Sequence, residues 1–189
     1  MKKSIKKSLL LTTKSFSLLN SNYIIEKIYV STNLILKSLK SGKKIIFCGN
    51  GGSASDSQHL SAELVGRYLK ARKAIASIAL TTDTSVITSI GNDIGFENIF
   101  SRQIEAIGNE GDVLFLLSTS GQSKNILKAI EIANKKKIKT IFLTSELLKN
   151  NRIKCDVIIK SPAYRVDRIQ EMHIAIGHII CEAIENNIE

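Results

Sequence analysis

The stretch KIIFCGNGGS (residues 44–53) is the clearest indication of the fold of this chain. Residues 44–48 form a short apolar run typical of a buried strand, and the glycine-rich residues that follow predict a tight loop. From about residue 54 to residue 69, apolar side chains recur at helical spacing, at Leu60, Leu64, Val65 and Tyr68. The stretch and its continuation therefore predict a strand, a loop and a helix in succession.

The same alternation continues towards the C-terminus. Helices are expected at 125–134 and at about 166–185, and further strands at 76–80, 112–117, 139–143 and 157–159. Strands that alternate with helices predict an α/β fold, a doubly wound parallel sheet flanked by helices on both faces. In such folds ligands bind at the carboxyl ends of the strands, here in the loops 49–55, 81–85 and 118–123.

The first forty residues have a different pattern. Ile24, Ile28, Ile35 and Leu39 mark one helical stripe, and Ile25, Tyr29 and Leu36 widen it. We therefore expect one domain over residues 1–189, with an N-terminal helical arm (1–41) and an α/β core (42–189). The arm's apolar surface predicts helix packing between subunits, and hence a homo-oligomer.

Composition and charge exclude several classes. Apolar residues make up 43% of the 189 residues, which is enough for a buried core. No apolar stretch approaches the roughly 18–20 residues that cross a bilayer, and the three leucines at 9–11 are too few for an exported segment. We expect a soluble, cytoplasmic protein with no membrane partner. The three cysteines have no CxxC spacing and stand in apolar runs, which is typical of buried thiols.

The net charge of +10 raises the question of nucleic-acid binding. The basic residues are scattered, however, and the densest run, 135–137, stands between a predicted helix and a predicted strand. No aromatic stacking motif accompanies it, and the chain has no Trp. We therefore expect no nucleic-acid partner. A basic field suits a small anionic substrate equally well.

Two loops have the composition of anion sites. Gly49-Asn50-Gly51-Gly52-Ser53 follows one predicted strand, and the hydroxyl-rich segment 118–123 follows another; each precedes a helix. Glycines allow close approach of the backbone, and a helix N-terminus offers free N–H groups to an anion. Each loop alone could be an ordinary turn or cap, but two at one sheet edge favour an anionic ligand. The Walker lysine motif is absent, which disfavours nucleotide hydrolysis.

Candidate metal ligands stand on two predicted helices. His59 and Glu63 are four residues apart and share a helix face, as a metal pair or as an ordinary exposed pair. On the last helix, Gln170 and His178 are about two turns, or ~12 Å, apart on roughly one face. Both could contact one ion only if it lay between them. His173 is offset from that face and is expected to be structural.

Read in order, these motifs resemble the sugar isomerase (SIS) domain family and, within it, the phosphoheptose isomerases. The resemblance extends from the N-terminal helices to the C-terminus, although 161–167 departs from the family pattern. Its motifs are GNGGSASDSQHLSAELVGR (49–67), LTTDTS (80–85), GND (91–93), STSGQS (118–123) and RIQE (168–171) leading to His178.

The resemblance implies an aldose–ketose isomerase that converts sedoheptulose 7-phosphate to D-glycero-D-manno-heptose 7-phosphate through an enediol, the opening step of bacterial heptose biosynthesis for lipopolysaccharide or capsule. By analogy, Glu63 and His178 are the acid/base pair. Zinc is implied at His59, Glu63, Gln170 and His178, in a tetramer with sites near subunit interfaces. Implied substrate contacts are Asn50, Gly51, Gly52, Asn92, Asp93, Ser118, Thr119, Ser120, Ser123 and Gln170.

Two alternatives belong to other functional classes. One is a non-catalytic SIS-domain binding protein of the replication-initiator partner type. That branch keeps the glycine and serine loops but departs at the positions that match Glu63 and His178, whereas this chain has both residues. The other is a sugar-phosphate-sensing regulatory module, which would usually accompany a DNA-binding domain; no helix-turn-helix segment has room here.

Overall fold

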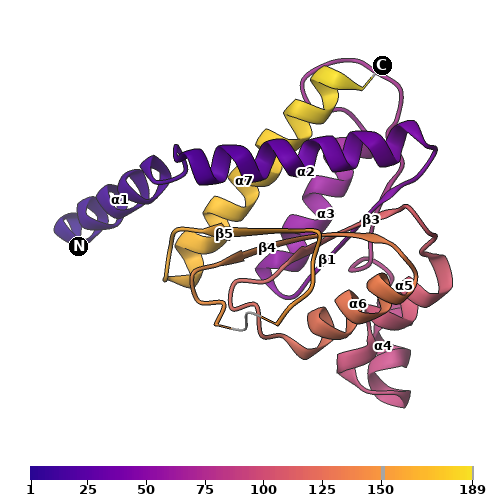
Figure 1. Cartoon of the computed structure of the whole chain (residues 1–189). Coiled ribbons are helices and arrows are strands. Elements are labelled where there is room, and N and C mark those ends of the chain that lie inside the picture. The colour runs from indigo at the N-terminus through magenta and orange to yellow at the C-terminus, as the bar shows by residue number, and fades with distance from the viewer. Residues whose placement is uncertain (150–151, 189) are drawn as a thin grey trace.

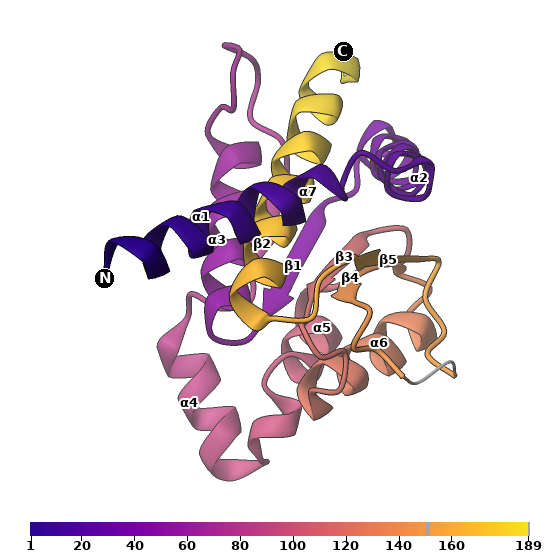
Figure 2. The same cartoon turned by 90° about the vertical axis from the view of Figure 1, so that its left-hand side faces the viewer.

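The computed structural model describes residues 1–149 and 152–188 and contains one parallel sheet between two layers of helices (Figures 1 and 2). The strand order is β2-β1-β3-β4-β5, and all four pairings are parallel. The predicted α/β class is confirmed. The strands are β1 (Ile45–Gly49), β2 (Ser77–Ala79), β3 (Val113–Leu117), β4 (Lys139–Ser145) and β5 (Val157–Ser161).

Seven α-helices and one 3-10 turn are present among the described residues. The arm consists of α1 (Lys2–Ser17) and α2 (Asn22–Lys40), and the longest helix, α7, closes the described chain. The remaining elements are α3 (Gly52–Val65), α4 (Thr84–Asp93), η1 (Phe96–Asn98), α5 (Ser101–Ile107), α6 (Lys124–Lys135) and α7 (Val166–Asn187). None of these helices combines the length and apolar character needed to cross a membrane.

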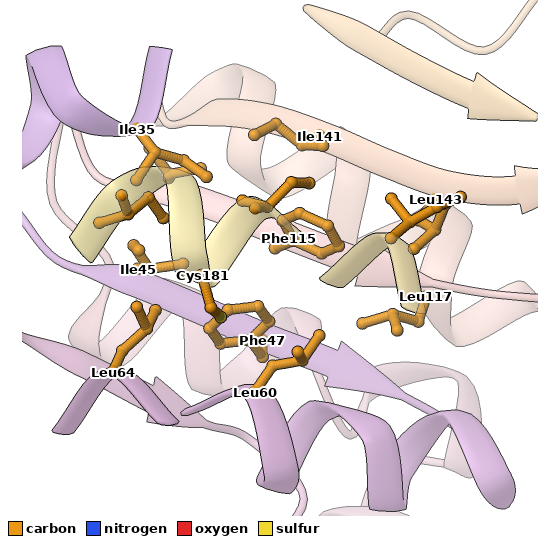
Figure 3. Close-up of a cluster of buried hydrophobic side chains, with 14 of the residues drawn as sticks. Ile35, Ile45, Phe47, Leu60, Leu64, Phe115, Leu117, Ile141, Leu143 and Cys181 are labelled. Atoms are coloured by element: carbon orange, nitrogen blue, oxygen red, sulfur yellow. The ribbon is translucent and has the colours of Figure 1, made fainter. Parts of the chain in front are cut away.

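Alternating side chains of the central strands enter two separate cores. On one face, Phe47 of β1 and Phe115 of β3 pair across the sheet with ring centroids 5.3 Å apart and pack under α2, α3 and α7 (Figure 3). On the other, their neighbours Ile46 and Leu114 pack under α5 and α6. Because both faces are covered, these strands are apolar along their whole length, which explains why they were recognisable as continuous runs.

Several expectations from the sequence differ from the structure. The helix expected to reach residue 69 ends at Val65, because Glu185 and Arg72 capture the backbone around the helix end. Residues 84–107, for which no element was expected, contain α4, η1 and α5; α4 has no buried residue that would mark it clearly as a core helix. Cys155 is only partly buried, whereas Cys48 and Cys181 are buried as expected.

The apolar stripe of the arm has its own partner within the chain. Ile24 and Ile35 are buried in the core beneath α2, which packs against α7 and β5. The expectation that this stripe needs a second subunit was therefore wrong for its central residues. Ile25 and Tyr29 remain 53% and 63% exposed, and no residue of α1 is buried.

Candidate active site

The first loop leaves the carboxyl end of β1 and enters α3. Gly51 has φ = +56°, a left-handed conformation that glycine adopts without a Cβ penalty. At Gly49, a Cβ would lie 2.5 Å from the backbone oxygen of Ser53, so this position also requires glycine. The loop is therefore held tightly against the start of α3. The Ser53 and Ala54 N–H groups donate to the Asn50 and Gly51 carbonyls, so the Gly51 and Gly52 N–H groups are the ones left to receive an anion.

The second loop, residues 118–123, leaves the neighbouring strand β3 and enters α6. Its turn is closed by the buried hydroxyl of Ser118, which accepts a hydrogen bond from the Gly121 N–H at 3.2 Å. The Ser145 hydroxyl donates to the Thr119 carbonyl at 2.6 Å and anchors the loop to β4. Since β1 and β3 are adjacent and parallel, the two predicted anion loops lie at the same sheet edge.

A pair of amides joins these loops. Asn50 Nδ2 donates to Asn125 Oδ1, and Asn125 Nδ2 donates to Asn50 Oδ1, both at 2.9 Å. Asn125 lies in the first turn of α6 and is 2% exposed. Each amide thereby uses one N–H donor and one oxygen lone pair in bonding to the other. The Asn50 side chain is therefore engaged in joining the loops, with one N–H and one lone pair left for a ligand.

Further along α3, three potential metal ligands converge. His59 Nε2 lies 3.1 Å from Glu63 Oε1 and 2.9 Å from His178 Nε2 of α7. The three ligand atoms all lie within 4.8 Å of one another. In the metal-free arrangement only one of the two facing imidazole nitrogens can donate to the other, whereas a cation would use both lone pairs. The donor set fits a divalent ion that accepts nitrogen and carboxylate ligands.

Close packing of α3 against α7 brings these groups together. A Cβ on Gly177 would lie 2.6 Å from the methyl carbons of Leu60, so the missing side chain allows the helices to approach at this level. His178 is the next residue and reaches across to α3. One end of this contact is held by Gln170, whose side-chain amide lies against Gly52 of the first loop. Gln170 therefore adjoins the anion loop, while His178 adjoins His59 and Glu63.

Burial shapes the protonation of groups near the site. It lowers the pKa of His178, with a further lowering from the neighbouring His59 and an opposing contribution from Glu63. Burial also raises the pKa of Asp56 to about 6, and its Oδ2 atom is buried without a hydrogen-bond partner. Both effects favour the neutral form in a partly dry environment.

Other expected site residues lie elsewhere. Asn92 and Asp93 end α4, which follows the carboxyl end of β2; they are exposed, and the Asn92 amide donates to the Asp93 carboxylate at 2.7 Å. The structure does not bring them into the cluster of His59 and its two partners. His173 is structural as expected, fully buried with Nε2 2.9 Å from the Thr144 carbonyl oxygen.

Three residues of the site were missed from sequence. Asn125 could have been suspected as a polar residue on an otherwise apolar helix face, and Gly177 as a glycine inside a helix beside a candidate ligand. Tyr68, expected on the apolar face of a helix, instead lies past the end of α3 with its ring centroid 5.6 Å from that of His178. Nothing in the local sequence indicated that contact.

Comparison with known proteins shows the family to which the chain is related. The SIS domain family model matches residues 13–145. A phosphoheptose isomerase from Nitratiruptor sp. is 51% identical over 162 residues, which cover 85% of this chain and 86% of the relative. Solved phosphoheptose isomerases from Neisseria gonorrhoeae and Francisella tularensis superpose with TM-scores of 0.88 and 0.91, at 36% and 31% identity, each covering 98% of both chains.

Proposed function

This chain belongs to the phosphoheptose isomerase family of SIS-domain proteins, and we propose how its own residues carry out the isomerisation. The substrate is sedoheptulose 7-phosphate and the product D-glycero-D-manno-heptose 7-phosphate. The observation that carries the assignment to this site is the convergence of His59 and Glu63 of α3, the helix that begins at the first anion loop, with His178 of α7.

The reaction moves a carbonyl from C2 to C1 through a 1,2-enediol. One group must remove a proton from C1 and return it at C2, while another exchanges protons with the two oxygens. Glu63 of α3 and His178 of α7 both belong to the cluster whose ligand atoms lie within 4.8 Å of one another. We assign them as the acid/base pair, with the lowered pKa of His178 favouring a neutral imidazole that can accept a proton.

The two loops are assigned to the substrate's phosphate and hydroxyl groups. Thr119, Ser120 and Ser123 are partly exposed around the turn that Ser118 closes. Asn50, Gly51 and Gly52 offer the first loop, and Gln170 lies beside it. His59 lies about 10 Å along α3 from Gly52, a separation suited to an extended sugar phosphate held by its phosphate at one end. Asn92 and Asp93 complete the proposed set from α4.

We propose zinc as the ion held by His59, Glu63 and His178, with Gln170 as a fourth ligand. When bound, it supplies a positive charge that polarises the substrate carbonyl. The residues themselves support this choice, because two imidazoles and a carboxylate are ligands typical of zinc. Glu63 and His178 would then each serve as ligand and as acid or base at different stages.

We also propose that the chain works as a cytoplasmic tetramer. The support is the apolar surface left on the arm, including Ile25 and Tyr29 of α2 and Leu9 and Leu10 of α1. A groove of about 410 Å³ lined by Phe16, Ile25 and Ile179 continues this surface between α1, α2 and α7. A phosphorylated sugar substrate agrees with a cytoplasmic location.

The test is direct turnover. Zinc-loaded protein is incubated with sedoheptulose 7-phosphate and the aldose product is followed, beside Glu63→Gln, His178→Gln and the control Glu131→Gln on the exposed surface of α6. We expect turnover in the parent and control, and loss of at least about a hundredfold in the two site variants, which should still bind the sugar phosphate. Tight binding without turnover by the folded parent would instead support the non-catalytic binding protein.

A further inference from the structure

The segment after α3 is fastened to the end of α7 by one buried carboxylate. Glu185 has a side chain only 2% exposed and accepts backbone hydrogen bonds from Tyr68 (3.1 Å), Leu69 (2.8 Å) and Lys70 (3.0 Å). The Arg72 Nε donates to the same carboxylate at 3.0 Å. Although burial raises the pKa of Glu185, the three N–H groups and Arg72 lower it overall, so the carboxylate is charged near neutral pH.

The guanidinium group of Arg72 also contacts the end of α3. Its NH2 group donates to the Glu63 carbonyl at 2.7 Å, and its NH1 group to the Leu64 carbonyl at 2.9 Å. These are two of the last carbonyls of α3, which have no partner within the helix. The guanidinium therefore caps the helix at the residue that carries the proposed base.

The other end of the assembly reaches the proposed acid. The Glu185 carboxylate fixes the backbone of Tyr68, whose ring lies 5.6 Å from the His178 ring at an interplanar angle of 33°. The His178 ring also lies 4.9 Å from the His59 ring, at an interplanar angle of 53°. His178 therefore has both the Tyr68 ring and the His59 ring as neighbours. Glu185 itself stands about two turns beyond His178 on α7.

We propose that Tyr68, Arg72 and Glu185 are positioning residues that hold Glu63 and His178 in register for the isomerisation. Arg72 acts on Glu63 through its carbonyl, and Glu185 acts on His178 through Tyr68. Because misplacement by about 1 Å can cost on the order of a hundredfold in rate, such a support affects catalysis without contacting the substrate. This inference rests on the proposed function for its kinetic readout only.

Substitutions of Tyr68 distinguish a positioning role from an effect on the stability of the fold. The Glu185 carboxylate accepts a hydrogen bond from the backbone N–H of Tyr68. Tyr68→Leu therefore keeps every hydrogen bond of Glu185 and removes only the ring against His178. We expect kcat to fall about tenfold with KM for sedoheptulose 7-phosphate changed less than about threefold. Tyr68→Phe retains the ring and should keep kcat within about twofold. Parental kcat in Tyr68→Leu, or equal losses in the Leu and Phe variants, would overturn the proposal.

A second readout needs no turnover. Co²⁺ titrated alone into the metal-free protein reports the arrangement of His59, Glu63 and His178 through its visible absorption. We expect Tyr68→Leu to change the band shape and weaken Co²⁺ binding about tenfold, and Tyr68→Phe to match the parent. An inactive parent would refute the proposed function while this spectrum still tests the positioning. An unchanged spectrum in Tyr68→Leu would count against it.

A third readout tests the link from Glu185 to His178 in the metal-free protein. The Tyr68 ring shifts the proton resonances of the His178 ring that it faces, which NMR detects without metal or substrate. Glu185→Gln removes the charge that holds the Tyr68 backbone, so we expect that shift to shrink, with the control Glu182→Gln unchanged. If a folded Glu185→Gln protein keeps the full shift of the His178 ring protons, the Glu185 carboxylate does not position Tyr68.

Discussion

The side-chain amides of Asn50 and Asn125 form two reciprocal hydrogen bonds of 2.9 Å and join the loops that follow β1 and β3. Asn125 is buried in the first turn of α6, so water cannot replace its partner. The spacing of the two anion loops therefore depends on a residue that contacts neither the metal ligands nor, in our assignment, the substrate.

Asn125→Asp should weaken the link between the two loops and place a negative charge beside them. The carboxylate has no N–H to give to Asn50 Oδ1, and a buried charge at this position would also repel a phosphate. We expect KM for sedoheptulose 7-phosphate to rise about tenfold or more, with Co²⁺ binding to the His59 cluster unchanged. Steady-state kinetics and a Co²⁺ titration check this. An unchanged KM in the folded variant would show that the amide pair has no part in substrate binding.

Gly49→Ala should affect the stability of the fold, whereas Gly52→Ala should affect the binding of substrate or metal. In Gly49→Ala the new Cβ would press on the Ser53 backbone, so we expect a loss of stability of roughly 1–3 kcal/mol. In Gly52→Ala it would meet the end of the flexible Gln170 side chain, which can move. That variant should keep its melting temperature within a few degrees while its KM or metal affinity worsens several-fold. Thermal unfolding and kinetics on both variants distinguish the cases, and equal destabilisation would contradict them.

The exposed apolar residues of α2 should control assembly. Tyr29→Glu places a charge on a side chain that is 63% exposed in the isolated chain, so it should leave the fold intact but weaken subunit contacts. We expect light scattering to report a tetramer for the parent at micromolar concentration and smaller species for the variant. Lys135→Glu, an exposed change on α6 across the sheet, is the matched control. A monomeric parent would end the tetramer proposal.

His173 should make stability fall in mild acid. Burial lowers its pKa to about 4 from an ordinary value of 6.5. Above pH 6.5 the His173 imidazole is neutral in both the folded and the unfolded protein. Between pH 6.5 and 4 only the unfolded protein binds the proton, so lowering the pH favours unfolding. The full loss in the free energy of unfolding is about 3 kcal/mol. Urea unfolding at pH 7 and pH 5 should show a smaller loss in His173→Gln. The same loss in both proteins would contradict this assignment.

Local pattern was sufficient for the sheet and for the position of both loops. The strands β1 and β3 are buried on both faces, so their sequences are continuous apolar runs, and glycine at position 51 is required by the backbone itself. The motifs of the two loops carried the family resemblance, and 51% identity to a relative confirmed it. The convergence of His59, Glu63 and His178 agrees with the predicted metal set, while Gln170 and the substrate residues remain predictions.

The alternation of strands and helices and the chemical types of the site residues follow from the sequence alone, because they depend on neighbours along the chain. The end of α3 and the surroundings of His178 follow from tertiary packing. Arg72 and Glu185 are 113 residues apart, and Tyr68 and His178 come from different elements. Their contacts arise when α7 packs on α3 at Gly177, and no local periodicity records a pairing between segments so distant in the chain.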